Sequence, residues 1–353
     1  MKRPSYRSLL VLTLGVACGG DGPQEADTSS YTPPATAHWM ADVFADRPDA
    51  QVGRILLPGA FNSTSYACDA ANGISPDAPE IVLALWGAED TPDDDPNRQR
   101  VVDWAKTQGR PLGQQLEDGI RFVELNVTLK DGVVTTWHSV YGVPLDDVLD
   151  EVVAFALAWP DEVVVLTFGL TLDSTDWPLL ADSLTAPRGD GASLCDLVYD
   201  GPEDAALASL SDVRASGRNL IWAPDGELRT WLDTRGDCPL SHGTTDRIWS
   251  ITVTPEGVES AIDASVGTRD PQHLLVNDFV FSLDGSATVL EQAGYISTYA
   301  GVREASQALG FLGDFPGRLI EGHDAEGNMN VLAGAYYEDT NLVEAAIAEN
   351  GAR

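Results

Sequence analysis

Apolar residues follow two different spacings along this chain. Residues 163–168 form an apolar run interrupted only by Thr167, which is typical of a strand buried on both faces in a parallel sheet. Between Pro144 and Trp159, apolar residues recur every three or four positions, which predicts a helix with one buried face. Such strands and helices alternate over most of the chain, and this order favours an α/β fold with a parallel sheet.

The same criteria place elements along the rest of the chain. Strands are predicted at 52–57, from 120, and at 162–169, 219–223, 248–253, 274–279 and 329–336. Helices are predicted at 38–45, 101–116, 144–159, 177–186, 203–215, from 255, and at 340–349, with an irregular insertion at 68–98. No Gly-x-Gly-x-x-Gly follows the first strand, so we favour a closed, irregular TIM-type (β/α) barrel over an open doubly wound sheet.

One predicted hairpin carries candidate chemistry. Asp131-Gly132 is a turn signal between two strands, because glycine adopts a positive φ at little cost. Glu124 and Asn126 are two positions apart and therefore share a face of the first strand, and His138 ends the second. A carboxylate, an amide and an imidazole placed in this way form either a catalytic or metal site or simply a polar strand end.

Composition and charge narrow the classes of function. The chain has 353 residues, of which 43% are hydrophobic, so it can bury a globular core. Its formal net charge is −34, with 55 acidic residues against 21 basic ones. Such a surface repels nucleic acid and anionic membranes, so we set nucleic-acid binding aside.

The amino terminus resembles a targeting segment. Lys2, Arg3 and Arg7 precede the apolar run Leu9–Ala17, which is too short to span a bilayer. Small residues lead to Cys18, as in a bacterial lipoprotein signal. We therefore predict an extracytoplasmic protein that is held at the cell envelope by a lipid on Cys18, with free secretion as the alternative.

These features divide the chain into three parts. We expect a signal peptide at 1–17, a flexible tether rich in Gly, Ser, Thr and Pro at 18–37, and one barrel domain at 38–353. Three further cysteines allow one disulfide and one leftover thiol, and we favour pairing Cys195 with Cys238. The chain has neither a Cys-x-x-Cys nor a His-Glu-x-x-His spacing, which argues against a zinc site.

Several segments, in order, resemble one family. They are 57–63 (Leu-Pro-Gly-Ala-Phe-Asn-Ser), 115–126 (Gln-Leu-Glu-Asp-Gly-Ile-Arg-Phe-Val-Glu-Leu-Asn), 138–142, 145–162 and 330–346. Together they resemble the phosphatidylinositol-specific phospholipase C X-domain group of barrel phosphodiesterases. The resemblance implies a phospholipid or other phosphodiester headgroup as ligand. It also implies two histidines that exchange protons with the reacting oxygens, and an arginine or a calcium ion that stabilises charge on phosphorus.

Mapped onto that family, the site is incomplete. Phe61 stands at the first histidine position, and His138 matches the second. Asn126 stands where the family has arginine or an acidic calcium ligand, while Asn62 and Glu124 match calcium ligands. Two further acidic positions align with Gly169 and Ala335. Loss of one general acid or base costs about 10²- to 10⁴-fold in rate.

Two hypotheses follow from these matches. In the first, the protein is a phosphoric diester hydrolase acting on a lipid, glycerophospho or inositol diester. Glu124 is then the base and His138 the acid, and Asn62, Glu124 and Asn126 hold a weakly bound calcium ion. In the second, the barrel is an inactive binding module in which Phe61 and Trp137 stack on a ligand near the mouth. Core packing is the alternative role for both aromatic residues.

One more polar pair falls near the same place. Asn277-Asp278 ends the predicted strand 274–279, so we expect it at the carboxyl-end rim, where barrel sites form. Whether it has a functional role stays open at this point.

Overall fold

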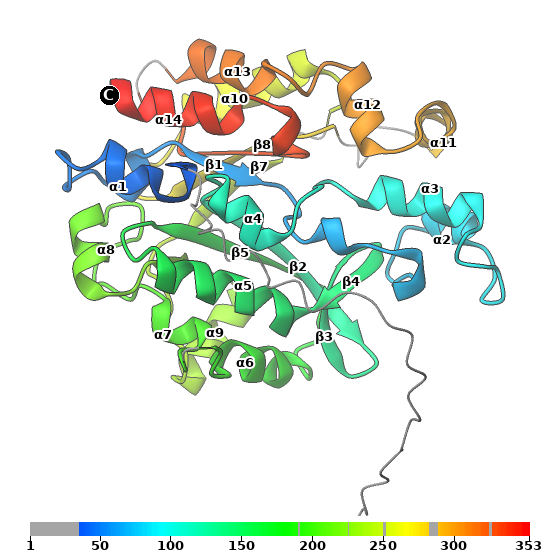
Figure 1. Ribbon diagram of the computed structural model, residues 1–353, viewed down its shortest axis with the longest axis horizontal. Coiled ribbons are helices and arrows are strands. Elements are labelled where there is room, and N and C mark those ends of the chain that lie inside the picture. Colours follow the sequence, from blue (N-terminus) through cyan, green and yellow to red (C-terminus); the bar gives the residue numbers. More distant parts are fainter. Residues whose placement is uncertain (1–34, 190, 225, 250–251, 282–288, 325–326) are drawn as a thin grey trace, which may run out of the picture. The chain divides into compact units, whose positions relative to one another are not determined.

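The parallel core is built around strand β5 (Val164–Leu170), which forms from the apolar run seen in the sequence. Val164 and Leu166 are buried in one apolar cluster, whereas Val163 and Val165 are buried in another on the opposite face. The predicted burial on both faces is therefore confirmed. The computed structural model describes residues 35–353 except 190, 225, 250–251, 282–288 and 325–326 (Figure 1).

Seven strands of the sheet are parallel neighbours. In order they are β6 (Leu220–Trp222), β5, β2 (Phe122–Lys130), β1 (Leu57–Ala60), β9 (Val331–Gly334), β8 (Leu274–Phe279) and β7 (Thr245–Trp249). Two antiparallel strands, β3 (Val133–His138) and β4 (Val140–Pro144), extend from β2. The expected α/β architecture with a parallel sheet and a central hairpin is confirmed.

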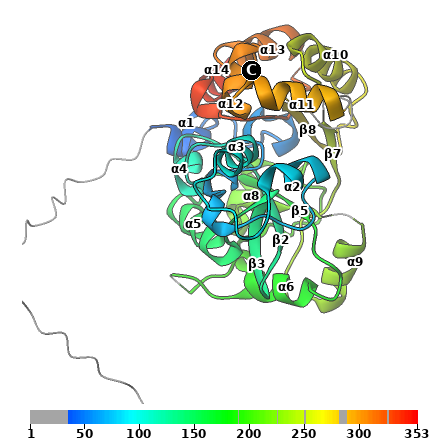
Figure 2. The same cartoon turned by 90° about the vertical axis from the view of Figure 1, so that its right-hand side faces the viewer.

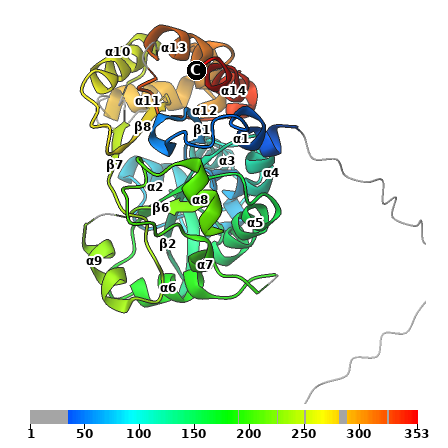
Figure 3. The ribbon, with the colours of Figure 1, turned by 90° about the vertical axis from the view of Figure 1, so that its left-hand side faces the viewer.

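The strands follow the order of the expected irregular (β/α) barrel, but hydrogen bonds between the described strands do not close it. Within the described residues, β6 and β7 end the parallel order and no strand pairing joins them. The free edge of β6 is occupied instead by a loop residue. Ser241 N donates to Trp222 O (2.9 Å), and Ser241 Oγ accepts from Trp222 N (3.1 Å). These two bonds use the backbone groups of Trp222 with which a closing strand would pair. Figure 3 shows the ribbon from the side on which β6 and β7 are labelled.

Helices cover the sheet on its outer sides (Figures 1 and 2). They are α1 (Trp39–Val43), α2 (Glu80–Trp86), α3 (Pro96–Ala105), α4 (Leu112–Glu117), α5 (Leu145–Ala158), α6 (Trp177–Thr185), α7 (Leu194–Leu197), α8 (Leu210–Ser216), α9 (Gly226–Arg235), α10 (Pro255–Val266), α11 (Val289–Thr298), α12 (Val302–Ala308), α13 (Phe315–His323) and α14 (Leu342–Ala352). Across the described residues, no helix combines the length and apolar character that crossing a bilayer requires.

Three expectations for the first third of the chain are wrong. The helix expected at 101–116 is interrupted, since α3 ends at Ala105 and α4 begins at Leu112. The strand expected at 52–57 is a 3-10 turn at Val52–Arg54 followed by β1 at Leu57–Ala60. Asn330 explains the difference, because its Nδ2 donates to the carbonyls of Val52 (3.0 Å) and Ile55 (2.8 Å) and so fixes a bent backbone there. The irregular insertion expected at 68–98 contains α2 and the start of α3, whose apolar residues form a small core of their own.

The predicted turn and disulfide are both present. Asp131 (φ 51°) and Gly132 (φ 80°) adopt left-handed conformations in the β2–β3 turn, as the dipeptide predicts. Cys195 and Cys238 form the favoured disulfide, with their Cα atoms 4.9 Å apart. Cys68 is a buried free thiol.

The amino-terminal predictions fall mostly outside the described residues. The signal peptide 1–17, the lipid-bearing Cys18 and most of the tether lie there and stay predictions. The expected domain boundary at residue 38 falls inside a 3-10 helix, Ala35–His38. Ala37 in that helix is fully buried, so the packed structure includes the last three residues assigned to the tether.

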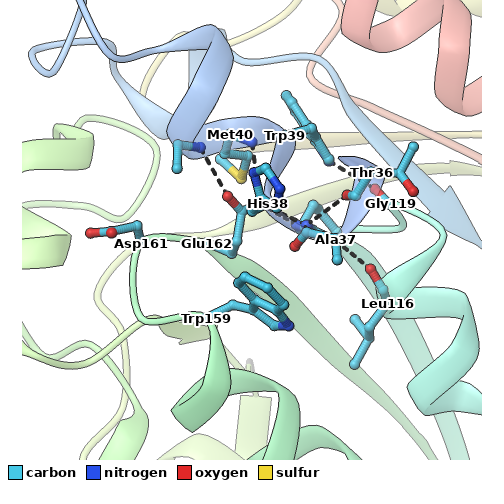
Figure 4. Close-up of polar contacts among 12 residues, drawn as sticks. Thr36, Ala37, His38, Trp39, Met40, Leu116, Gly119, Trp159, Asp161 and Glu162 are labelled. Carbon is cyan, nitrogen blue, oxygen red and sulfur yellow. Dashed lines mark hydrogen bonds and ion pairs between the residues drawn. The ribbon is translucent and has the colours of Figure 1, made fainter. Parts of the chain in front are cut away.

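One buried ion pair joins this amino-terminal segment to the sheet (Figure 4). Arg121 and Glu162 are fully buried, and two guanidinium nitrogens of Arg121 donate to Glu162 Oε2 (2.6 and 2.9 Å). Arg121 also donates to the carbonyls of Ala37, Leu116 and Ile120, at 2.7 to 2.8 Å. Glu162 accepts from the backbone N–H groups of Met40 (3.2 Å) and Ala41 (2.9 Å). Both charges are therefore surrounded by hydrogen-bond partners, as a buried pair requires.

We expect Arg121→Met to lower the free energy of unfolding by about 3 kcal/mol or more, because it leaves the Glu162 carboxylate buried without its cation. The urea midpoint measures the loss. Asp314→Asn is the matched control, since it breaks the exposed pair of Arg318 and Asp314 and should change stability by less than about 1 kcal/mol. Equal midpoints for the two variants would show that the buried pair does not hold the fold.

Candidate functional site

The loop after β1 is held rigidly at the carboxyl end of the sheet. Phe61 N donates to Gly334 O (3.0 Å), and Phe61 O accepts from Thr107 Oγ1 (3.0 Å) and Gln108 Nε2 (2.7 Å). Asn62 follows with a φ of 46°, a left-handed conformation that asparagine tolerates better than most residues. The backbone is therefore fixed at the position where the family resemblance expects a histidine.

Glu124, on β2, is only 5% exposed, and both of its carboxylate oxygens are engaged. Oε2 accepts from Asn62 N (2.9 Å), while Oε1 forms an ion pair with Arg247 Nη1. Backbone bonds to Ser63 hold the strand beside it. A carboxylate buried and paired in this way is poorly placed to take a proton from a substrate.

Arg247, on β7, joins two buried carboxylates at the carboxyl end of the sheet. Its Nε donates to Asp278 Oδ2 (2.7 Å) and its Nη2 to Asp278 Oδ1 (3.1 Å), in addition to the pair with Glu124. Burial alone lowers the pKa of Arg247, but the attraction of Asp278 and Glu124 outweighs it and raises the pKa overall, so the guanidinium stays charged. Burial raises the pKa of Asp278 to about 6, although Arg247 opposes that shift.

His138 ends β3 and faces the loop after β1. Its Nδ1 lies 2.6 Å from the carbonyl oxygen of Ala105, which can only accept, so Nδ1 carries the proton and the neutral ring presents Nε2 as its acceptor. The Phe61 ring meets the imidazole edge-on, with centroids 6.4 Å apart. The guanidinium carbon of Arg247 lies 5.5 Å from the centre of the same Phe61 ring. Phe61 therefore contacts both His138 and the Glu124–Arg247–Asp278 cluster.

The three residues proposed as calcium ligands meet, but as partners of one another. Asn126 Nδ2 donates to Asn62 Oδ1, and Asn62 N binds Glu124. The Asn126 side-chain oxygen occupies the space that a Cβ at Gly169 would need, so an acidic side chain has no room there. Within the described part of the chain, no group of three or more His, Cys, Asp or Glu residues could hold a metal ion. As arranged, these oxygens do not fit calcium, which prefers six to eight oxygen ligands.

Trp137, which we expected to stack on a ligand together with Phe61, does not line the cavity that His138 and Phe61 line. It neighbours His138 on β3, and successive side chains of a strand point to opposite faces. Its indole Nε1 is buried without a hydrogen-bond partner among the described residues. The structure thus brings Phe61 and His138 together and leaves Trp137 outside.

A cavity opens beside His138. Its wall is largely apolar and is contributed by α2, α3, α11, α12 and the ends of strands. Phe61 and Ala335, the two positions where the family resemblance expects a histidine and an acid, both form part of that wall. The polar side chains in the wall are Arg100, Thr107, His138 and Ser139, and Trp104 and Trp249 add indole N–H groups. Trp104 Nε1 is buried without a hydrogen-bond partner in the part of the chain that the structure describes.

Sequence reasoning missed Arg247. It precedes the strand that we expected at 248–253, and nothing in its neighbours along the chain distinguishes it. Asp278 was expected at the rim, and the structure places it there, on β8 beside Arg247. Asn277, its neighbour, instead accepts a hydrogen bond from Ser265 Oγ (2.6 Å) beneath α10.

Comparison with known proteins gives a consistent result, although no family model matches the chain. PI-PLC X domain-containing protein 2 is 27% identical in Mus musculus over 161 residues (44% of this chain, 45% of that protein) and 26% identical in Homo sapiens over 190 residues (52% and 59%). The chain thus spans about half the length of these relatives. Phosphatidylinositol-specific phospholipase C from Listeria monocytogenes superposes with a TM-score of 0.59 at 15% identity, over 89% of this chain and 98% of that one.

The chain is PI-PLC X-domain-like. The likeness to the Listeria enzyme, and to a pentafluoro-Phe-containing phospholipase C from Staphylococcus aureus (TM-score 0.56, 15% identity, 89% and 97% coverage), establishes the fold. Several residues of the motifs on which the resemblance depended are structural. Gln115 Nε2 donates to Ser63 O and Arg110 O (both 2.7 Å) and so positions the site loop, whereas Arg121 and Glu162 form the buried pair.

We expect Arg247→Met to lower the thermal midpoint, because Glu124 and Asp278 then face each other without a cation. Adding Asp278→Asn should recover part of the loss, with a coupling free energy of about 1 to 3 kcal/mol in a double-mutant cycle. Strictly additive losses in that cycle would mean that Arg247 does not link the two carboxylates.

Calcium titration tests the donor set directly. Because Glu124 is paired with Arg247 and Asn62 is bonded to Asn126, we expect no saturable heat of binding at millimolar calcium. A saturable heat that disappears in Glu124→Gln would show that these residues rearrange to hold the ion.

Proposed function

We propose that this domain binds a lipid phosphodiester in the cavity beside His138, and that it does not carry out the two-histidine hydrolysis of phospholipase C. The ligand class follows from the likeness to PI-PLC X-domain proteins. The single observation that carries the proposal is Phe61, which stands where a proton-transferring histidine is expected and packs against His138. A phenyl ring neither accepts nor donates a proton.

The remaining acid–base candidate does not replace the missing histidine. Glu124 is engaged by Arg247 and by Asn62 N, and taking a proton would cost it the pairing that keeps its charge buried. His138 alone can supply one proton-transfer group, but the reaction needs one group on each side of the phosphorus. Binding is therefore better supported than turnover.

Two cationic or hydrogen-bonding groups suit a phosphodiester at the cavity. Arg100 is exposed and lines the cavity with His138, and among the described residues it makes no ion pair. His138 Nε2, which is not used by the bond to Ala105, can donate to a phosphate oxygen when the ring is protonated. Attachment of the protein to a membrane through Cys18 belongs to the same proposal and remains a prediction from the sequence.

Hydrolysis assays on a monomeric short-chain phosphatidylinositol and on glycerophosphodiesters test the proposal. We expect the unmodified protein to bind the lipid in a calorimeter without releasing product. Phe61→His should then raise release by about 10²-fold or more over background, and adding His138→Ala should abolish that gain.

Phe168→His is the matched control, because the partly buried Phe168 lies on β5, packs on Trp222 with ring centroids 5.1 Å apart and does not line the cavity. It should create no hydrolysis. Product release by the unmodified protein that disappears in His138→Ala would contradict the binding proposal and establish a phosphodiesterase with a single histidine.

A further inference from the structure

The cavity beside His138 has a volume of about 170 Å³. The insertion helix α2 supplies Ile81, Val82 and Leu85 to its wall, and α3 supplies Val101 and Trp104. These helices lie on the side of the molecule that faces the viewer in Figure 2, with α11 and α12 next to them. At the edge, Trp249 is 44% exposed and contacts the Phe61 ring.

The wall offers few polar groups to a polyhydroxylated headgroup: besides Thr107 and His138, its described residues contribute only Arg100, Ser139 and the indole N–H groups of Trp104 and Trp249. The Thr107 hydroxyl is already used, since it donates to Phe61 O (3.0 Å) and bonds Ser65 Oγ (2.8 Å). His138 Nδ1 is occupied by Ala105 O. A ring of hydroxyl groups placed here would lose its hydrogen bonds to water and find few replacements, which costs free energy for every unpaired group. An alkyl chain in the same place loses nothing polar and gains burial.

The volume sets the length of chain that fits. An apolar protein cavity of about 150 Å³ holds one benzene molecule, so a cavity of this size accommodates about six carbon atoms. Arg100 and His138 line the same cavity, so a phosphate attached to such a chain can stay beside a cation and an imidazole. The arrangement of an apolar wall with basic groups matches an amphiphile that carries one chain and one anionic head.

We propose that this cavity takes the first carbons of one alkyl chain of a lipid phosphodiester that binds as a monomer. This inference rests on the proposed function and specifies which part of the lipid enters the protein. The headgroup then points away from the apolar wall, and the protein does not need an inositol-sized polar pocket in this cavity.

A series of methyl n-alkyl phosphodiesters with alkyl chains of two to ten carbons tests the inference. The affinity of the full-length protein for each compound is measured by calorimetry, below the micelle concentration of that compound. Each added methylene should tighten binding by about fourfold until about six carbons are buried, and the affinity should then level off.

Two substitutions on α2 form a matched pair. Val82→Trp fills the cavity from a half-buried position, so the gain in affinity with chain length should disappear. Leu83→Trp makes the same kind of change at the next, half-buried position, which does not line the cavity, and it should keep the full length dependence. If Val82→Trp loses its native circular dichroism, Leu85→Asp serves instead, because a charge in the wall should abolish the dependence in the same way.

The outcomes separate this inference from the proposed function. If the unmodified protein binds the two-carbon and ten-carbon diesters equally, the alkyl-chain inference is overturned while phosphodiester binding stands. Absence of binding to every member of the series overturns both. Equal loss of the length dependence in Val82→Trp and Leu83→Trp would mean that the alkyl chain of the ligand binds outside this cavity.

Discussion

The ion pair between Arg121 and Glu162 is the constraint on which the rest of the fold depends. It lies where β2 and β5 begin. It binds the segment before α1 through the carbonyl of Ala37, and α1 itself through the N–H groups of Met40 and Ala41. Because both charges are buried, neither can be removed without leaving the other unpaired. The pair therefore fixes three segments that are far apart in the sequence against the amino end of the sheet (Figure 4).

Strand β2 links this structural pair to the candidate site. Arg121 lies at its start, and Glu124 and Asn126 follow a few residues later towards the carboxyl end. A shift of one residue in the register of β2 would turn Glu124 away from Arg247. The residues that carry the resemblance to phospholipase C are thus of two kinds. Gln115 and Arg121 stabilise the fold, whereas Phe61 occupies a position where the family has a catalytic histidine.

The local spacing of apolar residues was sufficient to predict the helices and strands in which buried positions recur regularly. Strand β8, helix α5 and the β2–β3 turn agree with the sequence because their spacing or turn residues already specify them. The strand predicted at 52–57 was wrong. The apolar residues of this segment are buried in core clusters, but hydrogen bonds from the distant Asn330 bend its backbone. The site was predictable in part for the same reason: Phe61, Asn62 and Glu124 lie close to one another through β1 and β2. Arg247, which is 123 positions from Glu124 in sequence, is brought there only by the order of the strands.

The charge balance of the site decides where an anion can sit. Arg247 contributes one positive charge against the two carboxylates of Glu124 and Asp278, so at neutral pH this cluster carries a net negative charge and repels a phosphate. The cavity that Phe61 lines has Arg100 and His138 and, among its described residues, no acidic side chain in its wall. In a protein whose formal net charge is −34, a place with basic groups and no carboxylate is where an anionic headgroup meets the least repulsion. The phenyl ring of Phe61 contacts the guanidinium of this anionic cluster and also lines the cavity that suits a lipid phosphate, so the two places are neighbours with opposite preferences for an anion.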